Sequence, residues 1–241
     1  MASHDIYPTL SGAIATWREV EVMASNIANA NSTGFKEQLV SFELQDRGDV
    51  PLQSSYVKVN AAGADLTDGP VQQTNVATHI ALRGEGFLVA QTEDGEQILT
   101  RSGALQLDSQ GYLVTHRGER VLGEGGPLQV PLQETIEFSR DGTVTSRRGD
   151  GTEFAVSQVG KLQFLTADEV ESLGGSRWRA VGDLRPAEGT TVIQGALEGS
   201  NVDPIGSMVQ LIQASRHFEM YQRAMRTSDE LDGRIYQTVR G

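Results

Sequence analysis

The sequence predicts a mainly β protein with long terminal α-helices. The central part is expected to be an antiparallel β-sandwich or barrel-like domain, and the N- and C-terminal helices are expected to pair as a coiled coil. Apolar residues follow helical spacing at both ends of the chain, which predicts the helices. Short apolar runs separated by Gly- and Asp-rich turns fill residues 80 to 202, and no helix pattern separates them, which disfavours a parallel sheet.

The first expected helix covers residues 5–30. Asp5 can cap its start, and Pro8 is early enough to be tolerated in the first turn. Residues 26–36 end it, with asparagines that compete with helix and a glycine, Gly34, that reaches the left-handed region freely. The apolar stripe of this helix alternates spacings of three and four and consists of Leu10, Ala13, Trp17, Val20, Ala24 and Ile27.

The second expected helix begins at Pro204, with Asp203 as its N-cap. A helix of about 36 residues would run roughly 54 Å, which is too long to cover one small domain. It therefore needs a partner, and the N-terminal helix is the first candidate. Its seam consists of Leu211, Ala214, Phe218, Tyr221, Met225, Ser228, Leu231, Ile235 and Val239.

These patterns predict three parts. Residues 1–36 together with 201–241 form a discontinuous terminal helical domain, residues 37–79 an extended connector with a short strand near Tyr56, and residues 80–200 a β-rich outer domain. Within the β-rich part, hairpin turns are predicted at Asp94-Gly95, Asp108–Gly111 and Asp141-Gly142.

Three further segments of the β-rich part have local predictions. Gly84-Glu85-Gly86 is expected to be a hairpin rather than a dinucleotide-binding loop, because Val89 replaces the third glycine. Residues 167–175 are expected to be one helical turn or a loop. Trp178 is expected to anchor a core or an interface.

Composition excludes several classes of function. The net charge of −12 argues against nucleic-acid binding and against an anionic membrane surface. The absence of cysteine removes disulfides, Cys-ligated metals and thiol catalysis, and the four histidines have no metal-ligand spacing. The Asp141-Gly142-Thr143 and Asp150-Gly151-Thr152 fragments lack the rest of a calcium loop. No catalytic residue, cofactor or metal site is therefore predicted, although the many carboxylates leave a glycosidase pair open.

The chain carries no run near the roughly 18 apolar residues of a membrane span. Its N-terminus lacks a basic segment followed by an apolar one. We therefore expect no membrane insertion and no cleaved signal peptide.

Several segments resemble bacterial flagellar axial proteins of the rod and hook. A-S-N-I-A-N-A-N-S-T-G-F-K at 24–36 is similar to the N-terminal signature of that family. G-E-G-F-L-V at 84–89 and L-T-R-S-G-A-L-Q-L-D-S-Q-G-Y-L-V-T at 99–115 are similar to its β-domain motifs, as is V-L-G at 121–123. Q-G-A-L-E-G-S-N-V-D-P at 194–204 is similar to its closing motif. His79 departs from the family, where an aspartate usually precedes Ile-Ala.

The resemblance implies a structural subunit of the flagellar basal-body rod, the drive shaft for motility. Arg216-His217-Phe218-Glu219-Met220 looks most like the proximal-rod type, with the distal-rod type as the alternative. The implied partners are proximal and distal rod subunits, further copies of the chain and the flagellar export apparatus, with export lacking a cleaved signal peptide. The terminal helices would form the inner layer of the periplasm-spanning tube and the β domain its outer layer.

Both helical seams are broader than one monomer can cover, so we expect them to mediate assembly. Two different functions would also suit a β-rich chain, namely a secreted hydrolase acting on peptidoglycan and a stand-alone binding module. The residues expected at the assembly interface are Leu10, Trp17, Val20, Ile27, Asn29, Asn31, Gly34, Phe35, Leu211, Phe218, Tyr221, Met225, Leu231 and Ile235.

Overall fold

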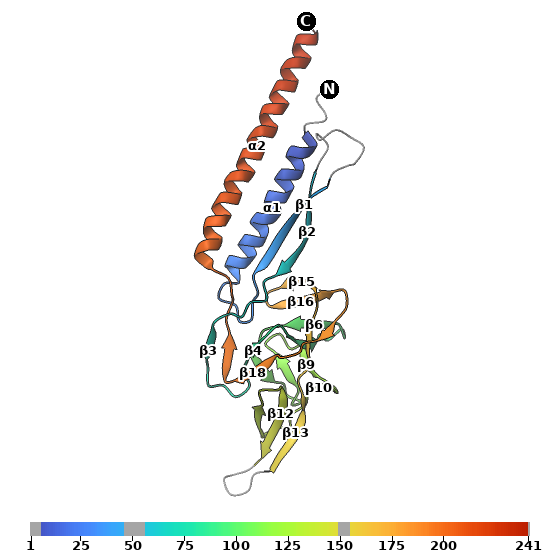
Figure 1. Ribbon diagram of the computed structural model, residues 1–241, viewed down its shortest axis with the longest axis vertical. Coiled ribbons are helices and arrows are strands. Elements are labelled where there is room, and N and C mark those ends of the chain that lie inside the picture. The colour runs from blue at the N-terminus through green and yellow to red at the C-terminus, as the bar shows by residue number, and fades with distance from the viewer. Residues whose placement is uncertain (1–5, 46–55, 149–154, 241) are drawn as a thin grey trace. The chain divides into compact units, whose positions relative to one another are not determined.

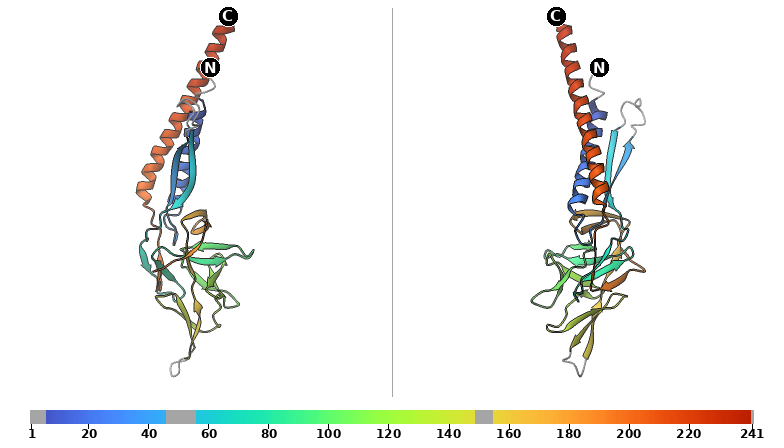
Figure 2. Two further views of the ribbon diagram at one scale, coloured as in Figure 1. Left: turned by 45° about the vertical axis from the view of Figure 1, so that its right-hand side comes forward. Right: turned by 90° about the vertical axis from the view of Figure 1, so that its left-hand side faces the viewer.

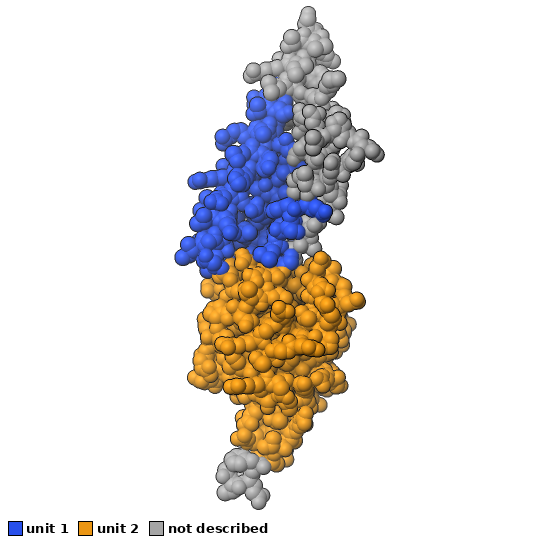
Figure 3. Space-filling view, viewed as in Figure 1, with its two compact units in different colours: residues 1–28, 38–63, 203–241 blue, residues 29–37, 64–202 orange. Residues whose placement is uncertain are grey.

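The structure is a computed structural model that describes residues 6–45, 56–148 and 155–240. The chain forms two compact units, each built from segments that are far apart in the sequence (Figure 3). Unit 1 comprises residues 1–28, 38–63 and 203–241, and unit 2 comprises residues 29–37 and 64–202.

Unit 1 contains both helices. Helix α1 (Ile6–Ala28) lies alongside helix α2 (Pro204–Arg240), and α1 also contacts strand β1 (Figures 1 and 2). Strand β1 (Gln38–Gln45) pairs with strand β2 (Tyr56–Ala64) in a two-stranded sheet. Both helices and their pairing are thus as predicted from the two apolar stripes.

Two residues explain why α2 begins at Pro204. The Asp203 carboxylate accepts a hydrogen bond from the Ile205 N–H at 3.1 Å, which satisfies one of the donors that have no partner within the helix. Pro204 occupies the first helical position, where its missing N–H costs nothing. The predicted cap at Asp5 lies outside the described residues.

Unit 2 is mainly antiparallel β. Its largest sheet has the order β15-β16-β6-β5-β9-β8-β7, with β10 on β9, β14 on β5 and β17 on β14. The strands of this sheet are β5 (Phe87–Gln91), β6 (Gln97–Thr100), β7 (Leu105–Leu107), β8 (Leu113–Thr115), β9 (Arg120–Gly123), β10 (Gly126–Pro127), β14 (Phe164–Thr166), β15 (Glu169–Gly174), β16 (Arg177–Val181) and β17 (Arg185–Pro186).

Three smaller sheets complete unit 2. One has the order β11-β12-β13, and the other two pair β18 with β4 and β19 with β3. Their strands are β3 (Val71–Gln73), β4 (Ile80–Arg83), β11 (Thr135–Phe138), β12 (Thr143–Arg148), β13 (Ala155–Lys161), β18 (Thr191–Gln194) and β19 (Ala196–Glu198). The last two pairings join the start of the β-rich region to its end, because both partners are more than a hundred residues apart.

Two hydrophobic clusters form the core of unit 2. The larger contains Leu88, Leu113 and Val144 among its buried members, and the smaller surrounds Phe87 and Trp178. Trp178 is fully buried, so the structure confirms it as a core anchor. Alternate residues of β5 enter different clusters, because successive side chains of a strand point to opposite faces.

The three predicted hairpin turns are confirmed. Gly95, Gly111 and Gly142 each adopt positive φ where two neighbouring strands reverse direction. In the second of these turns the Asp108 carboxylate accepts hydrogen bonds from two backbone N–H groups, those of Gln110 and Tyr112, each at 2.8 Å. Such side-chain closure is typical of aspartate in turns.

Two local predictions are wrong. Gly84-Glu85-Gly86 does not close a hairpin, because β4 before it pairs with β18 while β5 after it pairs with β6. Residues 167–175 are not a helical turn or a loop throughout, since β15 pairs with β16 through a turn at Gly174-Gly175. Residues 37–79, expected to be an extended connector, hold the three strands β1, β2 and β3.

Candidate assembly surface and buried ion network

One side of α2 is covered within unit 1. The covered or half-covered side chains recur every three or four residues at Leu211, Ala214, Phe218, Tyr221 and Met225. The Phe218 ring lies 5.3 Å from the Trp17 ring of α1, measured between centroids. This stripe coincides with the seam that the sequence predicts, although the side chains of Leu231 and Ile235 lie outside the described part.

Several of the buried residues of α1 are small. Ala13, Ala15 and Thr16 are buried, and a Cβ added at Gly12 would lie 2.9 Å from the Tyr221 ring. Glycine at this position therefore allows the two helices to approach closely. The predicted stripe of α1 is only partly covered, because Ala13 is buried and Val20 and Ile27 are half-buried, while Leu10 and Trp17 are exposed.

Unit 1 leaves a second apolar face uncovered on α2. Its residues follow helical spacing and are exposed, with Ile205 at 76%. We call this face the outer stripe, and it consists of Ile205, Met208, Val209, Ile212 and Met220. On α1, Ile14 is exposed beside the predicted Leu10 and Trp17. Regular rows of exposed apolar side chains are typical of surfaces that bind another protein.

The end of the N-terminal signature lies inside unit 2. Phe35 is fully buried, and the Gly34 N–H donates to the Glu198 carbonyl at 2.8 Å. Gly34 has a φ of 65°, and a Cβ there would overlap the backbone of Arg101 and Ser102. Glycine is required at this position by both conformation and space. Asn29 is half-buried and accepts a hydrogen bond from Ser32, whereas Asn31 is exposed.

Asn26, the first asparagine of the signature, ties α1 to β1 within unit 1. Its side chain is fully buried, donates to the Gln38 carbonyl at 3.0 Å and accepts from the Gln38 N–H at 2.9 Å. An amide side chain supplies both the donor and the acceptor that this pairing with one backbone residue needs. The asparagine-rich segment is therefore more than a helix cap.

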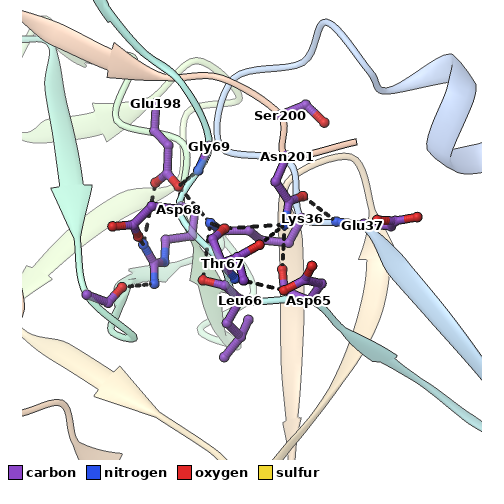
Figure 4. Close-up of polar contacts among 12 residues, drawn as sticks. Lys36, Glu37, Asp65, Leu66, Thr67, Asp68, Gly69, Glu198, Ser200 and Asn201 are labelled. Carbon is purple, nitrogen blue, oxygen red and sulfur yellow. Dashed lines mark hydrogen bonds and ion pairs between the residues drawn. The ribbon is translucent and has the colours of Figure 1, made fainter. Parts of the chain in front are cut away.

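A buried ion network lies in unit 2 and includes Lys36, the last residue of the N-terminal signature (Figure 4). The Lys36 ammonium lies 2.6 Å from the Glu198 carboxylate, and both side chains are fully buried. Arg101, also fully buried, lies 3.4 Å from the other oxygen of Glu198 and 3.7 Å from the half-exposed Asp68. We call Lys36, Asp68, Arg101 and Glu198 the ion network.

Further contacts support the network. Lys36 donates to the Thr67 carbonyl at 2.5 Å, and the Gly69 N–H donates to Glu198 at 3.1 Å. Arg101 donates to the Gly84 carbonyl, and its guanidinium lies 5.4 Å from the centre of the Phe87 ring. A buried charge needs such partners, because an unpaired one would cost several kcal/mol. The Nε of Arg101 is nevertheless buried without a hydrogen-bond partner among the described residues.

Burial also changes how readily the two cations hold their protons. It lowers the pKa of the Lys36 ammonium below its usual 10.5, and the hydrogen bond and charge of Glu198 oppose this change without cancelling it. Burial likewise lowers the pKa of Arg101, opposed mainly by the charge of Glu198. The anions of the network thus favour the charged forms of both cations.

Sequence analysis missed the ion network and the outer stripe. Charged residues are usually on the surface, so Lys36, Arg101 and Glu198 gave no sign of burial in the sequence. The outer stripe was detectable, because Ile205, Val209 and Ile212 have the i, i+4, i+7 spacing of a helix face.

Nothing in the described part of the chain suggests a reaction centre. No group of three or more His, Cys, Asp or Glu side chains among the described residues is arranged to hold a metal ion. Neither helix, over its described residues, combines the length and apolar character that crossing a lipid bilayer requires. The surface features that do stand out are apolar stripes on paired helices.

Paired terminal helices with uncovered apolar faces, joined to a closed β unit, define a structural subunit that assembles with other chains. Three family descriptions match in chain order: "Flagella basal body rod protein" at residues 6–36, "Flagellar hook protein FlgE/F/G D1 domain" at 81–146, and "Flagellar basal body rod FlgEFG protein C-terminal" at 193–238.

Curated relatives match over almost the whole chain. The flagellar basal-body rod protein FlgF of Salmonella typhimurium is 33% identical over 98% of both chains, and that of Escherichia coli is 32% identical over 98% of both. The rod protein FlgG of Borreliella burgdorferi is 27% identical over 95% of this chain and 96% of its own. The chain belongs to the flagellar basal-body rod protein family, which is structural and not enzymatic.

Proposed function

We propose that the chain is a proximal-rod subunit that polymerises through its terminal helices into the tubular drive shaft of flagellum-dependent motility. The observation that carries this proposal is the outer stripe of α2, which stays exposed although α2 already covers α1. A contact between unlike surfaces of successive copies builds an open helical tube when its rotation does not close.

The predicted interface residues have different parts in this proposal. Leu10 and Trp17 are exposed and are available to a neighbouring subunit. Phe218 and Tyr221 are already half-covered beside α1, so they hold the helix pair that the neighbour meets. Gly34 and Phe35 are buried in unit 2, so they stabilise that unit rather than touch a neighbour. To the interface we add the outer stripe.

Rod membership means assembly with other rod subunits in the flagellar basal body. The finer assignments belong to this proposal: proximal and distal rod proteins and further copies of the chain as neighbours, and delivery by the flagellar export apparatus without a cleaved signal peptide. The β-rich residues 80–200 would form the outer layer of the rod and the terminal helices its inner layer.

A distal-rod position is the second candidate. It is favoured by the similarity to FlgG proteins, which extends over more than nine-tenths of the chain. Identity is lower for these relatives, 27–28%, than for the FlgF relatives at 31–33%, so we place the proximal position first.

Crosslinking in purified basal bodies tests both the position and the surface. The chain has no cysteine, so Ile212→Cys in the outer stripe provides a single reactive position. We expect its crosslinks to join proximal-rod subunits, whereas crosslinks only to distal-rod subunits would establish the second candidate. Gln158→Cys, exposed on β13 of unit 2, is the matched control. Incorporation of Ile212→Cys without any subunit crosslink would contradict the outer stripe as an interface.

A further inference from the structure

Most basic side chains of unit 2 have an anionic or aromatic partner within the unit. The side chains of Arg83, Arg117 and Arg140 are different, because they make no ion pair or hydrogen bond with any described residue. Acidic residues outnumber basic ones in this unit by 21 to twelve, so a cation without a partner is unusual there. Arg83 and Arg140 also line the same groove. The nine basic residues with a carboxylate or aromatic partner are Lys36, Arg101, Arg120, Arg147, Arg148, Lys161, Arg177, Arg179 and Arg185.

The groove lies along strand β18, between these two arginines. Arg83 is the register partner of Thr191 in the β4–β18 pair, so their side chains share one face of that sheet. On the other side of β18, the Val192 N–H donates to the Arg140 carbonyl at 2.9 Å. Neighbouring hydrogen-bonded segments lie about 4.8 Å apart, so the backbones of the two arginines flank β18 at a spacing of about 10 Å. We call Arg83, Arg140 and Thr191 the cationic groove.

The carboxylates nearest to the groove are engaged elsewhere. Asp141 accepts from the N–H of Thr143 at 3.2 Å and from its hydroxyl at 2.8 Å. Glu124 lies 3.6 Å from the Lys161 ammonium, and Glu85 does not line the groove. The groove has a volume of about 480 Å³, which leaves room for side chains of another chain. Its two uncompensated positive charges call for a ligand with negative charge.

The β5–β6 hairpin carries a matching pair of negative charges. Glu93 and Asp94 are consecutive at its tip, and both side chains are exposed and bond to no described residue. Two backbone hydrogen bonds close the turn, from the Gly95 N–H to the Thr92 carbonyl and from the Thr92 N–H to the Glu96 carbonyl, each at 3.0 Å. The two carboxylates are therefore presented on a narrow, closed tip that can enter a groove.

We propose that the cationic groove of one copy of the chain binds the Glu93-Asp94 hairpin tip of a second copy. Guanidinium and carboxylate groups form charge-assisted hydrogen bonds, which are stronger than those between neutral groups. The groove and the tip belong to different sheets, so the contact joins unlike surfaces and can repeat along a row of copies. The inference rests on the proposed function only in that copies of the chain lie side by side. It adds a contact between β units to the contact through the terminal helices.

Crosslinking between two full-length chains in solution tests this contact. The natural sequence has no cysteine, so one chain carries only Thr191→Cys in the groove and the other only Gln97→Cys beside the hairpin tip, both at exposed positions. The two chains have affinity tags of different size and are mixed with a short bis-maleimide. We expect a crosslinked heterodimer, and we expect its yield to fall as salt is added, because salt screens exposed charges.

Charge reversal identifies the groups that hold the heterodimer together. Arg140→Glu in the groove chain, or Glu93→Arg in the hairpin chain, replaces attraction by repulsion and should lower the yield about tenfold. Combining the two reversals should restore the yield, because the charges then match again. Arg117→Glu is the matched control, since it reverses another exposed arginine that has no described partner and lies outside the groove. It should leave the yield unchanged.

The thermal unfolding midpoint shows which variants keep their fold, and the salt series needs no charge reversal at all. Absence of the heterodimer, or a yield that responds neither to salt nor to the reversals, overturns the proposal. Loss in both reversals without recovery in the combined pair also overturns it, because the groove then binds a different acidic group. The readout uses purified chains in solution, so it is separate from the basal-body crosslinking that decides the proposed function.

Discussion

Unit 1 and unit 2 differ in how far their apolar and charged side chains are buried. Of the sixteen large apolar side chains that are exposed in the described part, ten lie in unit 1, although unit 1 is the smaller unit. Unit 2 buries two apolar clusters and even four charged residues, each with partners. Unit 2 thus buries most of its apolar side chains within one chain, whereas unit 1 leaves exposed the apolar faces that we propose for assembly.

Removal of α2 tests this difference most severely. A chain ending at Asp203 loses the outer stripe and the partner of α1 but keeps all of unit 2, so we expect no incorporation into rods and a folded β unit. Motility and basal-body composition report incorporation, and burial of Trp178, seen by fluorescence in a Trp17→Phe background, reports the fold of unit 2. Normal incorporation of this truncated chain would refute assembly through the terminal helices.

Glu198→Ala tests the completeness of unit 2. The substitution leaves Lys36 and Arg101 buried without their shared anion, so we expect a loss of about 3–5 kcal/mol in the free energy of unfolding. Urea unfolding measures this loss. Glu96→Ala, which breaks the exposed pair of Glu96 with Arg179, is the control and should stay close to the wild type. Equal effects of the two substitutions would contradict the ion network as a stabilising centre.

The pH dependence of the free energy of unfolding also tests the ion network. The pKa of Lys36 is lower in the folded chain than its unfolded value of 10.5, so the unfolded chain binds more protons as the pH approaches that value. Wild-type stability should therefore rise relative to Lys36→Met between the folded pKa and pH 10.5, by about 1.4 kcal/mol for each unit of pKa difference. Urea unfolding from about pH 7 upward checks the direction, and a difference that falls with pH would be inconsistent with it.

Ile212→Ser should have the smallest effect on the isolated chain. The side chain is exposed, so we expect the free energy of unfolding to change by less than about 0.5 kcal/mol. Incorporation into the rod should nevertheless fall, because the outer stripe loses apolar area. Gln213→Ser, the exposed polar neighbour, is the control for both measurements. A variant that incorporates as well as this control would show that the outer stripe is not used.

The helical spacing of apolar residues was sufficient to predict the covered face of α2 but not that of α1. The seam of α2 was predicted because Leu211, Phe218 and Tyr221 repeat on a helix whose main neighbour is α1. Helix α1 contacts both α2 and β1, so its covered surface includes small residues such as Gly12 and Ala15 that an apolar stripe does not reveal. Tertiary neighbours, rather than the hydrophobicity of α1, decide which of its faces is covered.

The ion network could not be predicted because it depends on three distant segments. Lys36, Arg101 and Glu198 each fall in one of the three family-matched regions, yet no spacing along the chain relates them. The hairpin turns were predictable because Gly95 and Gly142 carry their information locally. Strand β15 was missed although Gly174 and Gly175 provide a local turn signal, because the acidic residues 167–173 lack the regular apolar alternation of a strand.

The pairing of Lys36 with Glu198 also sets the order in which the chain can fold. The two residues are 162 positions apart, so the contact closes almost the whole of unit 2 into one loop. Contacts between such distant residues form slowly, because the chain entropy of closing the loop is lost before the contact stabilises anything. A chain that emerges from its N-terminus first cannot complete this contact until residue 198 has appeared, only six residues before α2 begins. The contact between Lys36 and Glu198 can therefore form only shortly before α2 emerges.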